Sequence, residues 1–381
     1  MAPTTNGTKF EHKNGARLIC LDGGGVRGIV SLIMLDEIMK CIQKRRGLSE
    51  LPRPADYFEL AAGTSTGGII AIMLFRLHMT TEQAIEEYKN ISKEVFQTTL
   101  HGWDVPWFLE PVVTSFKTFF QRACFNQDNL EKAINSVMEK YGLDENDKKL
   151  KGKAPLDHKN SRKMFVCTTA QNRGETALLR SYRNNIEVTE SIVNDVLKVG
   201  HDQIDINLAV KATSAAPTYF PEVDWKPQGA DKNLIFWDGG LLNNNPVDQL
   251  WYARCDVVGP KEPEPPISCV ISFGTGYVTP KDTNHSWNKL FAIANSVIGF
   301  ATNTTAKGKD FSRHMCSMKG RRPGQADTLY IRFNPNLNGN DIGLADYKKI
   351  DLLIELAKEQ IKKEHKSGYL EKAVNAICPS D

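Results

Sequence analysis

Short apolar segments alternate with longer amphipathic segments along most of the chain. Several of the apolar segments end at glycine, as strands that run into turns often do. The segments that predict strands are residues 18–21, 57–63, 164–170, 233–240, 267–276 and 328–333. Strands that alternate with helices indicate an α/β fold, in which a mainly parallel central sheet lies between two layers of helices. We therefore expect a three-layer α/β/α architecture.

The segments between the predicted strands have the features of helices. Thr80 and Gln83 have the spacing of a capping box, which opens a helix. Asp128 is placed to cap a second helix, which runs through Lys140 and stops near Gly142. Apolar residues recur at helical spacing or run together in three further stretches: Leu32, Leu35, Met39 and Ile42; residues 67–77; and Ile350, Leu353, Ile354, Ala357 and Ile361.

Two stretches interrupt this pattern. Residues 143–163 are highly charged and poor in large apolar side chains, which predicts a surface excursion, and residues 258–267 form a proline-rich connection. No internal repeat is visible. We expect a flexible start over residues 1–16, a sheet-centred domain over residues 17–255, and an extension over residues 256–381 that packs on the same domain.

Composition narrows the class of protein. The chain has 381 residues, of which 41% are hydrophobic and 24% charged, and its net charge of +3 gives no sign of a nucleic-acid partner. No apolar run approaches the roughly 18 residues that span a bilayer, and the N-terminus lacks the apolar core of a signal peptide. We therefore expect a cytosolic protein. Reduced thiols are favoured over a disulfide frame or a metal site for the eight scattered cysteines, Cys20, Cys41, Cys124, Cys167, Cys255, Cys269, Cys316 and Cys378.

A glycine-rich loop follows the first predicted strand. Gly23, Gly25 and Gly28 satisfy the G-x-G-x-x-G pattern of a dinucleotide fold, which also needs an acidic residue at the end of the next strand, about 20 positions further on. Residues 44–54, "KRRGLSELPRP", offer neither that strand nor a convincing acidic site. No Gly-Lys-Ser/Thr follows, so a P-loop is excluded as well. The loop brings backbone amides close to an anion that is not predicted to be a nucleotide.

A second glycine motif indicates what that anion is. Gly63, Thr64, Ser65, Thr66 and Gly67 form a G-x-S-x-G nucleophile elbow between an apolar strand and an apolar helix, which is where such an elbow belongs. Taken alone, the motif also fits a strand-to-helix turn without chemistry. Beside a loop of exposed amides, it favours an activated serine whose transition state carries a transient oxyanion.

Arg27, within the glycine loop, has two interpretations of equal weight. It adds positive charge at the oxyanion, or it pairs with a carboxylate and braces the loop.

An activated serine needs a base. His285 and His314 lie downstream of an acid, in the usual order of hydrolases, but both stand in polar surface-like sequence. Asp238 ends a buried strand and is followed by Gly239 and Gly240, so its carboxylate can reach a serine on a neighbouring strand. An Asp-Gly turn without chemistry is the alternative, and for this motif alone it would be preferred.

Together these motifs resemble the patatin-like phospholipase family, which includes the plant patatins and the calcium-independent phospholipases A2. The matching blocks are "DGGGVRG" at 22–28, "GTSTG" at 63–67 and "DGG" at 238–240, and "ATSAAPTYFP" at 212–221 is also similar. The resemblance covers about residues 17–255, which would then be a patatin-like catalytic domain.

The resemblance implies a serine–aspartate dyad. Ser65 would attack the ester carbonyl, and Asp238 would accept its proton and later activate water. The amides of Gly24 and Gly25 would hold the oxyanion, and that of Val26 is a further candidate.

The resemblance also implies glycerolipid acyl esters as substrates, presented at a membrane or lipid-droplet surface, with peripheral contact between this cytosolic protein and that surface. It implies no metal and no cofactor, and the sequence contains no EF-hand loop.

An aromatic-rich stretch over residues 101–125 has two interpretations. It packs a helical cap onto the core, or it forms a lid or acyl groove at the lipid surface. Its large aromatic residues are Trp103, Trp107, Phe108, Phe116, Phe119 and Phe120, with Lys117 and Arg122 among them. The lysines at 148, 149, 151 and 153 are interpreted as a solvated face rather than a head-group site.

Two alternatives to the dyad hydrolase remain at this level. One is a serine esterase with a Ser-Asp-His triad that uses His285 or His314. The other is a lipid-binding module that keeps the fold without catalysis, against which the intact Ser65 and Asp238 argue.

Overall fold

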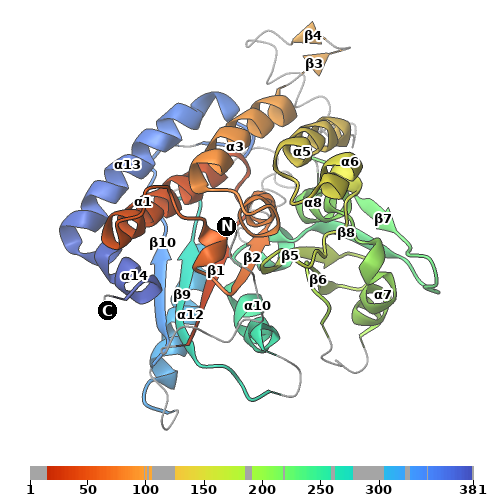
Figure 1. The fold of residues 1–381 in the computed structure, drawn as a ribbon. Helices are drawn as coiled ribbons and strands as arrows, with labels where there is room; N and C mark the ends of the chain where they lie inside the picture. The colour runs from red at the N-terminus through yellow and green to blue at the C-terminus, as the bar shows by residue number, and fades with distance from the viewer. Residues whose placement is uncertain are drawn as a thin grey trace, which may run out of the picture.

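The computed structural model describes residues 15–97, 99–100, 103–104, 125–184, 191–217, 219–258, 262–277, 304–321, 327–340 and 342–379. A central sheet has helices on both of its faces, which confirms the predicted three-layer α/β/α architecture (Figure 1). The strands of this sheet are β1 Ala16–Leu21, β2 Leu60–Thr64, β5 Lys163–Ala170, β6 Glu175–Arg180, β7 Val223–Trp225, β8 Leu234–Asp238, β9 Ile267–Phe273 and β10 Leu329–Phe333. A separate two-stranded sheet pairs β3 Thr99–Leu100 with β4 Trp103–Asp104.

The sheet is parallel through five neighbouring strands, in the order β10, β9, β1, β2 and β5. Antiparallel strands extend it beyond β5, where β6 and β8 pair with β5 and β7 pairs with β8. The two strands from the C-terminal third, β9 and β10, therefore belong to the same sheet as β1 and β2.

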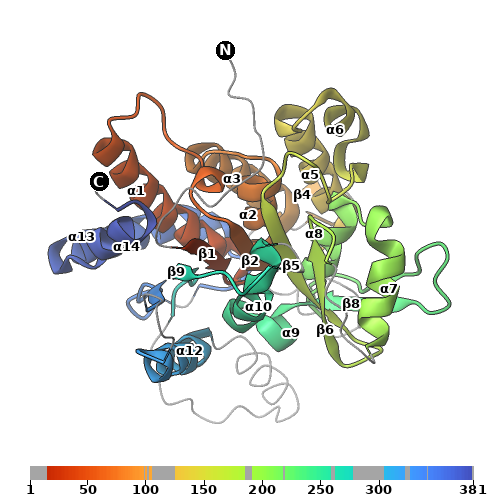
Figure 2. The ribbon, with the colours of Figure 1, turned by 60° about the horizontal axis from the view of Figure 1, so that its bottom comes forward.

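Helices cover both faces of the sheet. The helices of four or more residues are α1 Gly28–Arg46, α2 Thr66–Ala71 with its π-helical continuation Ile72–Arg76, α3 Thr81–Phe96, α5 Gln127–Tyr141, α6 Glu145–Leu150, α7 Ile192–Gly200, α8 Ile206–Ser214, α9 Gly240–Asn243, α10 Val247–Tyr252, the 3₁₀ turn Ala253–Val257, α12 Thr304–Met318, α13 Ile350–Ser367 and α14 Tyr369–Ile377. Figure 2 shows α10 and α12 on the side of the sheet opposite to α1 and α13.

The two faces of β1 explain this arrangement. Leu18 and Cys20 point into a core shared with α10 and α12, whereas Ile19 and Leu21 point into the larger core shared with α1, α3 and α13. A strand buried on both faces is typical of a parallel sheet in an α/β protein.

Several helix boundaries follow capping residues. The capping box of Thr80 and Gln83 is present in full at the start of α3, and α5 ends at Gly142. The predicted cap at Asp128 is wrong, because Asn126 is the N-cap residue and its side chain accepts a hydrogen bond from the Asp128 amide. The second strand starts later than predicted, at Leu60, because the amides of Tyr57 and Phe58 donate to the Pro54 carbonyl of the 3₁₀ turn at residues 54–56.

The prediction that residues 143–163 form a surface excursion is wrong for Asp147. Asp147, on α6, is buried and forms a bidentate ion pair with the fully buried Arg76 at the end of the π-helical segment, with both N–O distances 2.8 Å. Arg76 also donates to the carbonyls of Pro155 and Leu156. The Asp147 carboxylate can be buried because it pairs with Arg76. The charged stretch around Asp147 gives no sign of this, because Arg76 lies about 70 residues away in the sequence.

We expect Asp147→Ala to lower the free energy of unfolding by about 3–5 kcal/mol, because it leaves the buried Arg76 guanidinium without its counter-ion. Lys148→Ala, on the same helix but at a solvent-exposed pair with Glu145, should change it by less than about 1 kcal/mol. Urea unfolding of the two variants measures both values. A cost for Asp147→Ala no larger than that for Lys148→Ala would contradict this account of the pair.

None of the helices in the described part of the chain combines the length and the apolar character needed to cross a bilayer. Seven cysteines lie in this part and none is in a disulfide. Cys20, Cys167, Cys269 and Cys378 are buried, whereas Cys316 is exposed.

Candidate active site

Ser65 sits on a sharp turn between β2 and α2. Its backbone angles, φ 53° and ψ −128°, are strained for a residue with a side chain, and such a conformation costs about 1–3 kcal/mol. The surroundings enforce the turn: a Cβ on Gly63 would lie 2.2 Å from the Gly67 carbonyl oxygen, and one on Gly67 would lie 2.3 Å from that of Leu21. The glycines of the motif are therefore required by close approach of backbone.

Asp238 reaches Ser65 because β2 and β8 meet end to end along one edge of β5. On that edge Thr64 is opposite Cys167, and Asp238 is opposite the next residue, Thr168. β6 occupies the other edge of β5 over residues 165–170, so β2 and β8 must share the first edge. Since β2 runs parallel and β8 antiparallel to β5, their carboxyl ends converge at the same point.

The Asp238 carboxylate accepts two hydrogen bonds. One oxygen lies 2.7 Å from Ser65 Oγ, which donates, and the other accepts from the Gly240 amide at 2.6 Å. A Cβ on Gly239 would lie 2.2 Å from the Cys167 carbonyl oxygen, so this position also requires glycine. Asp238 is 6% exposed. Burial raises the pKa of its carboxyl to about 6, and the hydrogen bonds from Ser65 and Gly240 oppose that rise. A carboxylate of raised pKa in contact with a serine has the geometry of a general base.

The glycine loop lies directly beside Ser65. A Cβ on Gly23 would come within 3.0 Å of Ser65 Cβ. The amide of Gly23 donates to the Asn244 carbonyl (3.0 Å), and that of Gly28 donates within the loop, to the carbonyls of Gly25 and Val26.

Two amides of the loop make no short hydrogen bond to the described residues. The amide of Gly24 makes only a long contact with Thr66 Oγ1, at 3.3 Å, and that of Gly25 has no acceptor among the described residues. The amide of Val26 is engaged by the Leu344 carbonyl (2.8 Å), which argues against its use as a donor. The Arg27 amide donates to the Gly24 carbonyl at 3.1 Å.

The Arg27 side chain lines the same pocket as Ser65, and its Nε donates to the Gly24 carbonyl at 3.5 Å. Of the two interpretations of this residue, bracing of the loop is thus supported by a contact to the loop backbone.

A largely apolar pocket opens over these groups. Ser65, Asp238 and the loop residues Gly23–Gly25 line it together with apolar side chains of α2, α3, α5 and the segment before β7. The larger apolar side chains include Ile69, Ile91, Val95, Phe96, Leu130 and Phe220. No histidine is among the described residues that line it. The pocket therefore combines a serine, a carboxylate and the glycine loop with room for an apolar chain.

The one histidine candidate that the structure describes, His314, lies away from the pocket. The ring of His314, on α12, packs against Trp251 and Phe311 at the smaller core. His285 lies outside the described residues, as do the side chains of Trp103, Trp107, Phe108, Lys117 and Arg122. Phe116, Phe119 and Phe120 also fall outside them. Of the proposed lid or cap over residues 101–125, the structure describes only the backbone of β4 and Phe125, which packs against Phe96, Phe220 and Tyr219.

Several residues that shape the site were not predicted as site residues. Thr213 Oγ1 accepts a hydrogen bond from the Ser65 amide (2.9 Å) and donates to the Cys167 carbonyl (2.6 Å), which fixes the elbow on β5. Thr213 lies in the segment 212–221, so the sequence did contain a signal. Tyr88, whose hydroxyl donates to the Gly25 carbonyl at 2.5 Å, has no comparable local motif.

Two groups of side chains among the described residues could hold a metal ion. One is formed by Glu37, Cys41 and His365, and the other by Asp144, Asp147 and His158. None of these residues lines the pocket at Ser65, and Asp147 is the partner of Arg76.

Comparison with known proteins agrees with the sequence motifs. Residues 19–251 match the sequence model of the family described as "Patatin-like phospholipase". The chain is 28% identical over 364 residues to calcium-independent phospholipase A2-gamma of Oryctolagus cuniculus, which covers 95% of this chain and 40% of that protein. It is 27% identical over 242 residues to the cGAMP-activated phospholipase of Vibrio cholerae, covering 63% of this chain and 58% of that protein. Phospholipase A I of Arabidopsis thaliana is 26% identical over 314 residues, with coverages of 73% and 22%. The chain thus spans less than two thirds of the length of each of these relatives.

Proposed function

Because this chain belongs to the patatin-like phospholipase family, we propose that it hydrolyses fatty-acyl esters of glycerolipids at Ser65. The observation that carries the proposal is the 2.7 Å hydrogen bond from Ser65 Oγ to Asp238 within an apolar pocket. The pocket suits the acyl chain, while the ester carbonyl would lie between Ser65 and the glycine loop. We assign this chemistry to residues 17–255, with residues 256–381 packed on the same unit, and expect it to act at a membrane or lipid-droplet surface.

The reaction would proceed in two halves. Ser65 Oγ forms a bond to the carbonyl carbon as its proton passes to Asp238, and the electron pair of the carbonyl moves onto its oxygen. The amides of Gly24 and Gly25 would donate hydrogen bonds to that oxyanion, which is worth several kcal/mol in such sites. Asp238 then gives the proton to the departing alcohol, and the fatty acid remains on Ser65. Water attacks this acyl-enzyme with Asp238 again as the base, and the carboxylic acid leaves.

The second candidate, a Ser-Asp-His triad, is not favoured by a specific observation. The hydrogen bond between Ser65 and Asp238 is direct, and His314 packs against Trp251 and Phe311 instead. A dyad needs no further group between the nucleophile and its base.

The proposal predicts how activity depends on pH. The pKa of Asp238 is raised by burial to about 6, so the carboxyl is protonated below that pH and cannot accept the serine proton. We expect kcat/KM to fall about tenfold per pH unit below pH 6 and to level off above it. Initial rates between pH 4.5 and 8 measure the midpoint. Rates that stay nearly level down to pH 4.5, as a carboxyl with the ordinary pKa of 3.8 would give, would contradict a buried Asp238 as the base.

The function itself is tested by release of fatty acid from phosphatidylcholine vesicles and from triacylglycerol emulsions. The assay is run in excess chelator, since no metal is assigned to the reaction, with Ser65→Ala as the matched control. We expect release by the unaltered chain and not by the variant. The absence of release from every glycerolipid offered, by a chain that is folded, would favour the idle lipid-binding module.

A further inference from the structure

Residues from the C-terminal third of the chain surround the glycine loop, although they lie outside the range that the family match covers. Thr275 follows β9, Arg332 lies in β10, and Leu344 lies in the loop before α13. Each of the three contacts the loop or the residue that precedes it. The role assigned to the loop in catalysis therefore raises the question of what these contacts do.

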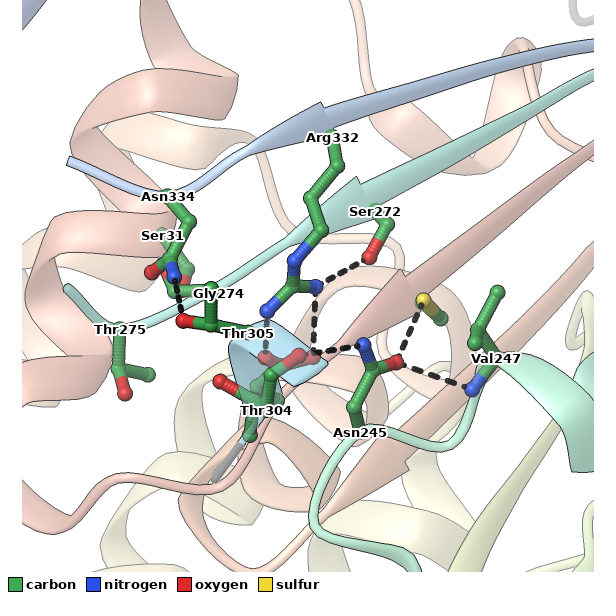
Figure 3. A network of polar contacts seen from close by, with 12 residues as sticks. Ser31, Asn245, Val247, Ser272, Gly274, Thr275, Thr304, Thr305, Arg332 and Asn334 are labelled. Carbon is green, nitrogen blue, oxygen red and sulfur yellow. Dashed lines mark hydrogen bonds and ion pairs between the residues drawn. The ribbon is translucent and has the colours of Figure 1, made fainter. Parts of the chain in front are cut away.

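Arg332 reaches across the sheet to the start of the loop. It lies in the same row of the sheet as Ser272 of β9 and Cys20 of β1. Its guanidinium donates to Ser272 Oγ at 2.6 Å and to the two oxygens of Asp22 at 3.3 and 2.5 Å. Asp22 is fully buried and immediately precedes Gly23. Figure 3 shows Arg332 beside Ser272, within a polar network that extends to the start of α12.

The ion pair with Arg332 also neutralises the charge of the Asp22 carboxylate beside the loop. Burial raises the pKa of the Asp22 carboxyl, and the Arg332 guanidinium opposes that rise. An isolated buried carboxylate at this position would oppose the negative charge that develops on the substrate oxygen. Paired with Arg332, it anchors the start of the loop without that penalty, since the two charges largely cancel.

The middle of the loop is held from the same side. The Leu344 carbonyl accepts from the Val26 amide at 2.8 Å, and Thr275 Oγ1 donates to the Gly23 carbonyl at 3.2 Å. Gly25 has φ +54°, and a Cβ there would lie 2.0 Å from the Leu344 carbonyl oxygen. These contacts use the peptide groups on both sides of Gly24 and Gly25. None of these supporting contacts uses the amide of Gly24 or that of Gly25.

We propose that Arg332 is a positioning residue for catalysis, which acts through Asp22 to fix the direction of the Gly24 and Gly25 amides. Thr275 and the Leu344 carbonyl complete this support. The C-terminal third thus contributes to stabilisation of the oxyanion without touching the substrate. This inference rests on the proposed function, because it assigns a role within the same reaction.

The test compares Arg332→Gln with Arg17→Gln in the full chain, with a soluble acyl ester as substrate. Arg17 is a suitable control. It is 3% exposed, lies in β1 and forms a partly buried ion pair with Glu59, but at the opposite end of the strand from the loop. We expect Arg332→Gln to lower kcat about 100-fold or more, as loss of an oxyanion donor does, with KM within about threefold. Its pH midpoint should stay near 6, since Asp238 is untouched.

Two further variants complete the design. Arg332→Lys keeps the charge and should recover at least about tenfold of the lost kcat, whereas Arg17→Gln should keep kcat within about threefold even if its melting temperature falls. Thr275→Val removes the hydroxyl that donates to Gly23 and should lower kcat about tenfold at constant KM. If Arg332→Gln does not fold, the kcat of Thr275→Val tests the inference in its place.

The inference is overturned if Arg332→Gln keeps the kcat of the unaltered chain, or loses no more of it than Arg17→Gln. With an unfolded Arg332→Gln, full kcat in Thr275→Val also overturns it. If the proposed function is wrong, Ser65→Ala still hydrolyses the ester. That result rejects the proposed function and the positioning role together. If Ser65→Ala loses activity but Arg332→Gln keeps the kcat of the unaltered chain, the positioning role alone is rejected.

Discussion

Ser65→Ala is expected to lower kcat by about four orders of magnitude or more, because no covalent acyl-enzyme can form without the hydroxyl oxygen. The replacement removes one atom from a half-buried side chain and leaves the elbow backbone held by Thr213 and the flanking glycines. Lipid should still enter the pocket, since its apolar lining is unchanged. Fatty-acid release under saturating substrate, with vesicle binding measured in parallel, separates the two effects.

A suitable control for Ser65→Ala is Ser92→Ala, since Ser92 also lines the pocket but lies on α3, away from the elbow. We expect Ser92→Ala to keep kcat within a few-fold. Full activity in Ser65→Ala would reject Ser65 as the nucleophile, whatever the behaviour of Ser92.

Asp238→Asn is expected to lower kcat by about 100- to 10,000-fold, the range that general-base assistance supplies. An asparagine side chain can accept from the Gly240 amide and donate to Ser65 Oγ, so both contacts of the carboxylate are kept in form. What is lost is the capacity to take the serine proton. Loss of activity in this variant is thus chemical rather than structural.

Stability provides the control for this variant. Because burial raises the pKa of Asp238 from 3.8 to about 6, folding disfavours the ionised carboxyl. The unfavourable contribution is absent below pH 3.8 and complete above about pH 6. Asp238→Asn should therefore melt at the same or a higher temperature than the unaltered chain at pH 7.5. His314→Ala and His285→Ala should keep activity within a few-fold, and a histidine variant as inactive as Asp238→Asn, yet folded, would favour a triad.

Local motifs indicated the candidate nucleophile and the candidate base, and they did so for physical reasons. A strand followed by a tight turn and a helix needs glycines at Gly63 and Gly67, where backbone comes within 2.2–2.3 Å of any added Cβ. Such constraints require particular residue types close in the sequence to Ser65, so the sequence shows them. The capping box at Thr80 and the stripe of α13 were predicted on similar local grounds, and both are confirmed.

Contacts between distant segments had no such signal. The convergence of β2 and β8 on one edge of β5 depends on strand order, which spacing along the chain does not determine. Arg332 pairs with Asp22 across 310 residues, and Arg76 with Asp147 across 71. A buried charged residue whose counter-ion lies far away in the sequence has the same local sequence pattern as a charged residue exposed to solvent. Asp147 was for that reason placed on the surface, and Arg332 was not assigned to the site.

The central claim, that Ser65 is the nucleophile and Asp238 its base, is tested most directly by covalent labelling. The unaltered chain and Asp238→Asn are treated with a fluorophosphonate at pH 7.5, and the modified residue and the rate of modification are determined by peptide mass spectrometry. The account predicts modification at Ser65 alone, with a rate in Asp238→Asn lower by about 100-fold or more. Modification of a different serine, or of Ser65 at an equal rate in both proteins, would contradict it.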